Sequence, residues 1–129
     1  MTDEELLVAA RKVRESAYCP HSNFRVGAAL IDDADNMHVG CNVENAAYPQ
    51  SSCAEAGAIS AMVAAGGKRI VTIAVAGGGD NTRACPPCGG CRQRIHEFSD
   101  SDTRIIFKDN DEEWHTFSID ELLPSSFKL

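Results

Sequence analysis

Residues 53–59 read CAEAGAI, and they place a thiol and a carboxylate in the first turn of an expected helix. The residues that follow are small or apolar as far as position 65, and Gly66 ends the helix. Glu55 is the only charged residue in this segment. A nearly uncharged helix is typical of a domain interior. We therefore expect a central, buried helix that carries Cys53 and Glu55 at its N-terminal end.

Further helices and strands are expected on both sides of this segment. Capping sequences and helical spacing of apolar residues predict helices over 2–17, 88–98 and 118–124. Apolar runs predict strands over 25–31, 37–43, 69–76, 103–108 and 113–117, and a loop is expected to start at glycines 77–79 and Asp80. This order indicates an α/β fold in a single domain, residues 1–129, with one mixed sheet of about five strands and helices on its faces.

Charge and composition limit the classes of partner. The 129-residue chain has a net charge of −7, which repels phosphate backbones and disfavours nucleic-acid polymers as partners. The acidic, amphipathic N-terminus does not resemble a secretory signal, and no apolar run is long enough to span a membrane. We expect a cytoplasmic protein whose six cysteines serve as ligands, nucleophiles or buried residues rather than as disulfides.

A second cysteine-rich stretch, ACPPCGGCRQ at residues 84–93, has the spacing of a metal site. Cys88 and Cys91 lie one turn apart at the start of a helix, where both thiolates can reach one Zn²⁺. Cys53 is the natural third ligand, and three protein ligands leave a position for water, as catalytic zinc sites do. A fourth thiolate from Cys85 would instead close a structural site. The register Cys85/Cys88 and a redox pair remain alternatives.

Glu55 favours the catalytic alternative. A buried carboxylate with no cationic neighbour is costly, although the dipole at a helix N-terminus also favours an acidic residue there. Beside three thiolates, Glu55 could accept a proton from water and pass it on.

These residues are similar to a known family. Cys53-Ala54-Glu55 together with PCGGC at 87–91 resembles the signature of zinc deaminases. YCPHSNFRVGAAL (18–30), GCNVENAAY (40–48), CRQ (91–93) and LLPSSF (122–127) resemble the small, homotetrameric cytidine deaminases, so the resemblance covers almost the whole chain.

The resemblance implies a three-layer α/β/α sandwich and the hydrolytic deamination of cytidine and deoxycytidine in pyrimidine salvage. It implies one Zn²⁺ per subunit, bound by Cys53, Cys88 and Cys91, with Glu55 as the proton shuttle. It also implies a homotetramer that shares active sites between subunits. Phe24 would pack against the pyrimidine, Asn42 and Glu44 would hydrogen-bond the ribose, and the remaining substrate contacts would be Ala46, Tyr48, Ala54 and, from a neighbouring subunit, Phe127.

One departure concerns the charge at the metal. The family often has an arginine after the glutamate, where this chain has Ala56 and Gly57. Helix N-terminal amides and Arg92 are the expected compensation for the charge of three thiolates. The small Ala56-Gly57 pair could also widen the pocket for another aminopyrimidine, such as blasticidin S or an N4-substituted cytidine. A zinc-stabilised binding module is the non-enzymatic alternative, and it would leave Glu55 without a role.

Overall fold

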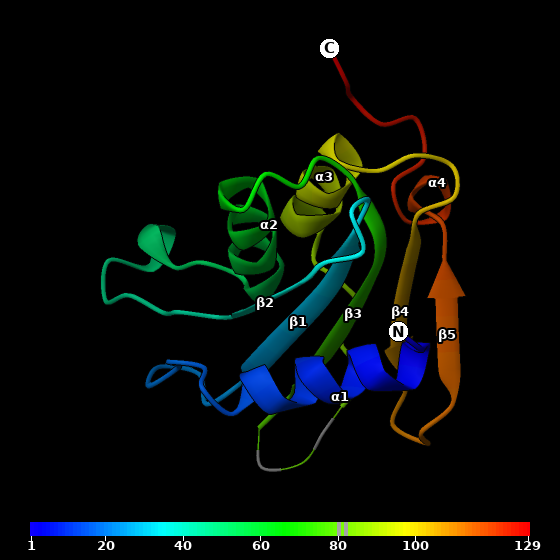
Figure 1. The fold of residues 1–129 in the computed structure, drawn as a ribbon. Helices are drawn as coiled ribbons and strands as arrows, with labels where there is room; N and C mark the ends of the chain where they lie inside the picture. The colour runs from blue at the N-terminus through cyan, green and yellow to red at the C-terminus, as the bar shows by residue number, and fades with distance from the viewer. Residues whose placement is uncertain (80, 82) are drawn as a thin grey trace.

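Strand β3 (Ile70–Gly78) is the central strand of a five-stranded mixed sheet in the computed structural model, which describes residues 1–79, 81 and 83–129 (Figure 1). It pairs antiparallel with β1 (Arg25–Asp32) and parallel with β4 (Arg104–Lys108). The edge strands β2 (Met37–Cys41) and β5 (Trp114–Phe117) complete the order β2-β1-β3-β4-β5. The predicted mixed sheet is confirmed, and β3 is buried because its residues are almost all apolar.

Helix α1 (Asp3–Arg14) covers one face of this sheet (Figure 1). The helix starts where the hydroxyl of Thr2 accepts a hydrogen bond from the Glu5 N–H at 3.1 Å. Leu6, Leu7 and Ala10 then recur at helical spacing and pack against apolar residues of β1, β3 and β4.

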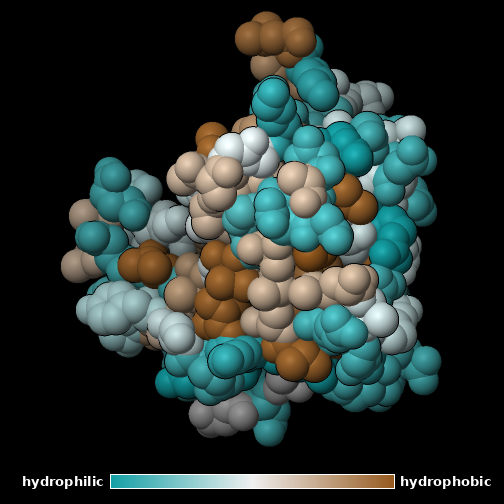
Figure 2. All heavy atoms as spheres, viewed as in Figure 1, coloured by the Kyte–Doolittle hydropathy of each residue, from teal (hydrophilic) through white to brown (hydrophobic). Residues whose placement is uncertain are grey.

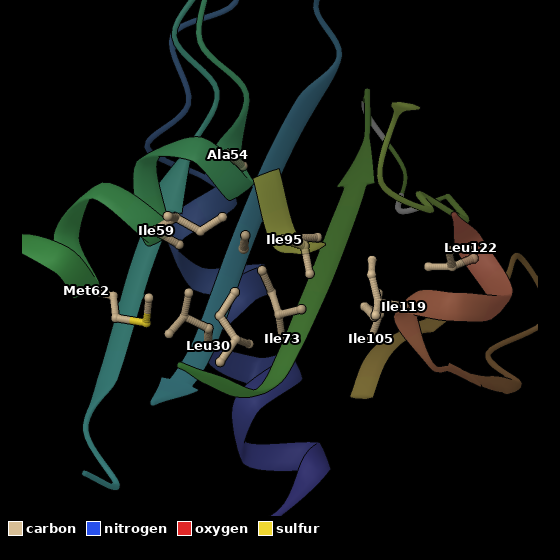
Figure 3. Packing of buried hydrophobic residues seen from close by; sticks show 12 residues of the cluster. Leu30, Ala54, Ile59, Met62, Ile73, Ile95, Ile105, Ile119 and Leu122 are labelled. Carbon is tan, nitrogen blue, oxygen red and sulfur yellow. The ribbon is translucent and has the colours of Figure 1, made fainter. Parts of the chain in front are cut away.

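The opposite face is covered by α2 (Ala54–Ala64), α3 (Gly89–Glu97) and the short α4 (Ile119–Leu122). Figure 3 shows their side chains directed toward Leu30, Ile73 and Ile105 of the sheet. These three strand residues are fully buried, and each contributes roughly 1.5–3 kcal/mol of hydrophobic stabilisation. With α1 on the other face, the architecture is the predicted α/β/α sandwich.

Two glycines place α2 directly against β2. A Cβ atom added to Gly40 would lie 2.4 Å from both the carbonyl oxygen of Ala54 and the amide nitrogen of Ala58. Gly57 faces Gly40 from the helix, where its own added Cβ would lie 3.4 Å from the Gly40 Cα. This backbone-to-backbone contact fixes the N-terminal turn of α2, and therefore the positions of Cys53 and Glu55.

The predicted order of helices and strands is confirmed, while several ends differ. Helix α1 stops at Arg14, and Tyr18 instead pairs with Val43 in an isolated bridge. Strand β2 ends at Cys41, and Val43 exchanges hydrogen bonds with Ser52. Strand β3 continues to Gly78, beyond the expected start of the loop, and the Asp80 of that prediction lies outside the described residues. Within the described chain, no helix is long and apolar enough to cross a membrane.

Candidate metal centre and active site

Three thiols meet where the N-terminal ends of α2 and α3 converge. Cys53 is the N-cap of α2, Cys88 is the N-cap of α3, and Cys91 lies in the first turn of α3. Their sulfur atoms all lie within 4.8 Å of one another, a spacing that suits thiolates bound at about 2.3 Å to a single zinc ion. The positive ends of two helix dipoles favour thiolates here. The donor set and its setting therefore fit zinc.

Cys85 does not belong to this group of thiols. Its side chain packs over Gly77, where an added Cβ would lie 2.7 Å from the Cys85 sulfur. Burial raises the pKa of the Cys85 thiol to about 12, so the thiol is neutral at physiological pH. The structure thus assembles the register Cys88/Cys91 with Cys53 and leaves one position open for a non-protein ligand.

Burial acts on the three ligand thiols to different extents. It raises the pKa of Cys53 and of Cys91, which is fully buried. Burial also acts to raise the pKa of Cys88, but the Cys91 N–H and the neighbouring thiols outweigh it, and the net pKa is lowered. Cys88 is therefore the most readily ionised of the three ligands.

Glu55 lies in the first turn of α2, beside the thiols, and is only 4% exposed. Burial raises the pKa of its carboxyl group, while the nearby Cys91 thiol and Arg94 guanidinium act in the opposite direction. A raised pKa makes this carboxylate a stronger proton acceptor than an ordinary glutamate. Its position and environment therefore suit a proton carrier.

Glu55 opens onto a cleft of about 560 Å³, within the range of small-molecule sites. Among the described residues, its lining includes no lysine or arginine but two carboxylates, Glu44 and Glu55, so it favours an uncharged ligand over an anionic one. The lining consists of His21, Ser22, Phe24, Val26, Asn42, Glu44, Tyr48, Ser51, Ser52, Cys53, Ala54, Glu55, Cys85, Pro86 and Cys88.

Five of the seven expected substrate contacts line this cleft: Phe24, Asn42, Glu44, Tyr48 and Ala54. The other two, Ala46 and Phe127, are not part of its described lining. Phe127 is 68% exposed, and its carbonyl oxygen accepts a hydrogen bond of 2.9 Å from the Gln93 side chain. Its segment runs away from the body of the domain (Figure 1).

Asn42 and Glu44 are each held by hydrogen bonds within the chain. Asn42 Oδ1 accepts from the Val26 N–H and Asn42 Nδ2 donates to the Phe24 carbonyl oxygen, both at 2.8 Å. Glu44 Oε1 accepts from the backbone N–H of His21 at 2.8 Å, and its Oε2 accepts from the Ser22 hydroxyl at 2.5 Å. The Ser22 hydrogen bond is the main reason that the pKa of Glu44 is lowered.

Sequence reasoning assigned no role to His21 and did not single out Ser22 or Pro86, yet all three line the cleft. His21 also meets the Tyr48 ring edge-on, with 5.4 Å between ring centroids. For His21 and Ser22 the available signal was their sequence neighbour Phe24, since a turn that presents one cleft residue also presents the residues beside it.

The arginines near the metal centre divide into two roles. Arg92 Nε donates to the Pro87 carbonyl oxygen at 2.8 Å, and its Nη1 donates to that of Leu122 at 3.0 Å. Arg94 Nη1, in contrast, lies 4.0 Å from the Cys91 sulfur. Charge compensation by Arg92 therefore stays a prediction. Arg94 is the arginine whose guanidinium group contacts a ligand sulfur among the residues that the structure describes.

Ala56 and Gly57 are not part of the described lining of the cleft, so the structure gives no support to a pocket widened by this pair. Gly57 instead serves the close packing of α2 on β2.

Comparison with known proteins agrees with this site. Residues 1–108 match the family model of the cytidine and deoxycytidylate deaminase zinc-binding region. The chain is similar to the cytidine deaminase of Halalkalibacterium halodurans, with 37% identity over 98% of this chain and 95% of the relative. It is 38% identical to the cytidine deaminase of Mycoplasma genitalium, over 97% and 95% of the two chains.

The fold is similar to the crystal structure of cytidine deaminase from Burkholderia pseudomallei. The TM-score is 0.89 at 38% identity, and the match covers 98% of this chain and 100% of that one. A zinc-type cysteine triad, a buried glutamate beside it and matches over nearly the whole chain agree with one another. The chain belongs to the cytidine and deoxycytidylate deaminase family.

Proposed function

We propose that this protein hydrolyses cytidine and deoxycytidine to uridine and deoxyuridine, releasing ammonia, with one zinc ion per subunit. Relatives that match almost the whole chain carry the name cytidine deaminase. The cleft supports an uncharged nucleoside as substrate, because its described lining contains two carboxylates and no lysine or arginine.

The observation that carries the proposal is the position of Glu55, which is buried beside three thiols and lines the cleft. When bound by Cys53, Cys88 and Cys91, zinc would lower the pKa of a water molecule and so supply a nucleophile near neutral pH. Glu55 accepts the proton of the attacking water and delivers it to N3 of the pyrimidine, which makes C4 more electrophilic. Glu55 then takes the proton of the hydroxyl group added at C4 and passes it to the departing amine, which leaves as ammonia while a carbonyl forms at C4, so that one water is consumed.

The remaining cleft residues orient the nucleoside. The Phe24 ring packs against the pyrimidine, and Ala54, at the start of α2, leaves room for the ring beside Glu55. Asn42 retains one amide hydrogen after its bond to Phe24, and Glu44 accepts from sugar hydroxyls. Tyr48 and Ala46 lie near the sugar, at the boundary between subunits.

The assembled enzyme is a homotetramer in the cytoplasm and serves pyrimidine salvage. Figure 2 shows apolar side chains gathered in the middle of one face, over the β1–β2 side of the sheet. Met37 and Val39 of edge strand β2 are 42% and 37% exposed, which suits burial against another subunit. Phe127, exposed on the outgoing C-terminal segment, completes the cleft of a neighbouring subunit.

The ultraviolet absorbance of cytidine tests this function directly. Wild-type protein is expected to convert cytidine to uridine, and Glu55→Gln to lower kcat about 10²–10⁴-fold while zinc remains bound. Glu97→Gln, an exposed change on α3, serves as the matched control and keeps full activity. Zinc-loaded wild-type protein without turnover of cytidine or deoxycytidine would refute the proposal.

A further inference from the structure

Ser22 connects two residues of the cleft lining, Glu44 and Phe24, to which the proposed function gives different roles. Its hydroxyl donates to Glu44 Oε2 at 2.5 Å, and the same oxygen accepts the backbone N–H of Phe24 at 3.0 Å. The backbone N–H of Ser22 also donates to Glu44 Oε1, at 3.2 Å. One short side chain thus holds both the carboxylate assigned to the sugar and the backbone of the residue assigned to the base.

The Phe24 backbone is held from both sides. Ser22 accepts from its N–H, and Asn42 Nδ2 donates to its carbonyl oxygen at 2.8 Å. Phe24 precedes β1, so strand pairing does not hold it, and side chains of the cleft do so instead. The direction of the Phe24 ring therefore depends on Ser22 and Asn42.

We propose that Ser22 is a positioning residue that couples sugar recognition by Glu44 to base packing by Phe24. The inference rests on the proposed function, because it needs a nucleoside with both parts in the cleft. The coupling follows from the geometry. A sugar that hydrogen-bonds to Glu44 contacts the same carboxylate that accepts from the Ser22 hydroxyl. The Ser22 oxygen in turn accepts the Phe24 N–H, so the two contacts share one side chain. The hydrogen bond from the Ser22 hydroxyl also lowers the pKa of Glu44 and keeps it ionised as an acceptor.

The test is a comparison of Ser22→Ala with Ser22→Thr. Alanine removes both hydroxyl hydrogen bonds, so the KM for cytidine is expected to rise on the order of tenfold while kcat stays within about twofold of wild type. Threonine keeps the hydroxyl, and its added methyl group has space because Ser22 is exposed, so its KM is expected near the wild-type value. Ser99→Ala, a serine hydroxyl lost at the far end of α3, is the matched control.

A double-mutant cycle with Glu44→Gln tests whether Ser22 acts through Glu44. The expected result is that Ser22→Ala raises KM by a smaller factor in the Glu44→Gln background than in wild type. If Ser22→Ala does not fold, as judged by thermal melting, Ser22→Cys takes its place, since sulfur is a weaker donor of similar shape.

Three results would overturn the inference. The first is an unchanged KM in Ser22→Ala, and the second is a Ser22→Ala variant that loses kcat but keeps its KM. The third is a KM that Ser22→Ala raises by the same factor in the wild-type and Glu44→Gln backgrounds. Wild-type protein without cytidine turnover would instead overturn the proposed function and this inference together, so the two failures are distinguishable.

Discussion

Asn42 Nδ2 donates to the carbonyl oxygen of Phe24 at 2.8 Å, so a residue assigned to the sugar holds the backbone of a residue assigned to the base. The Oδ1 atom of the same amide accepts from the Val26 N–H. Strand β2 ends at Cys41, and the Asn42 side chain supplies hydrogen bonds to the start of β1 just beyond that end. The side-chain amide of Asn42 therefore holds both the start of β1 and the backbone of a cleft residue.

Asn42→Ala is expected to reduce both stability and substrate affinity. Two partly buried backbone groups lose their partner, which costs about 1–3 kcal/mol in the free energy of unfolding. The KM for cytidine rises because Phe24 is released on its carbonyl side. Urea titration and steady-state kinetics measure the two effects.

Asn45→Ala is the control for that comparison. It removes one exposed hydrogen bond, from the Ala47 N–H to Asn45 Oδ1, and is expected to cost less than about 1 kcal/mol. Equal losses of stability in the two variants would contradict the structural role given to Asn42.

Cys85→Ser is expected to retain one zinc ion per chain, whereas Cys91→Ser is expected to lose it. Cys85 lies outside the group of thiols, while Cys91 is one of the three sulfurs that lie within 4.8 Å of one another. The zinc-to-chain ratio after gel filtration measures the difference. The opposite result, with zinc lost only from the Cys85 variant, would show that the metal uses the other register.

Gly40→Ala is expected to destabilise the fold and displace the metal centre. Its new Cβ would lie 2.4 Å from the backbone of α2 at Ala54 and Ala58, neither of which can move as a flexible side chain could. Overpacking of this kind costs about 1–3 kcal/mol or more. Thermal unfolding measures the loss, and zinc content shows whether the start of α2 has moved.

Gly89→Ala is the matched glycine control for stability. An added Cβ at Gly89 meets nothing within 4 Å, so its melting temperature is expected to stay near that of wild type. A tolerant Gly40→Ala variant would mean that α2 is not held by direct backbone contact with β2.

Asp32 and Asp109 occupy equivalent positions in the β1–β2 and β4–β5 hairpins. In each hairpin, the aspartate Oδ1 accepts hydrogen bonds from the N–H groups two and four residues further along the chain. The residue three positions after the aspartate has a φ of 63° in both hairpins. The aspartate Oδ2 lies next to a histidine six residues further on, at 2.7 Å from His38 and 2.8 Å from His115. The pKa of Asp32 is lowered mainly by the hydrogen bond from the Asn36 N–H. The pKa of Asp109 is lowered mainly by the hydrogen bond with His115.

These lowered pKa values predict how hairpin stability depends on pH. A lowered folded-state pKa stabilises the fold above the ordinary aspartate pKa of about 4, and that stabilisation is lost as the pH falls through the folded-state value. Asp32→Asn is therefore expected to lower the melting temperature at pH 7, and the difference from wild type should shrink below about pH 4. Melting curves across this range measure it.

Asp109→Asn provides the internal comparison. The Asp109 and His115 side chains are 30% and 41% exposed, against 2% and 10% for Asp32 and His38. Water can therefore replace more of the hydrogen bonding that the Asp109→Asn substitution removes. A smaller loss of melting temperature is expected. A pH-independent difference between Asp32→Asn and wild type would argue against the ionised carboxylate as the source of stability.

Local signals in the sequence determined the order of helices and strands, because caps and apolar periodicity act over a few residues. The hydroxyl of Thr2 caps α1 as its spacing from Glu5 predicts, and the nearly uncharged segment after Cys53 is a helix packed in the core. The pair Cys88 and Cys91 was equally readable, since three residues along one helix bring two side chains to the same face.

Tertiary packing alone decided which groups meet across the sequence. The contact of α2 with Gly40 sets where Cys53 stands relative to α3, and the fold directs Arg92 to carbonyl oxygens, whereas Arg94 reaches a ligand sulfur. The Ser22–Glu44 hydrogen bond joins residues 22 positions apart. Such pairings depend on how helices and strands pack in three dimensions, and no local pattern of residues encodes that distance.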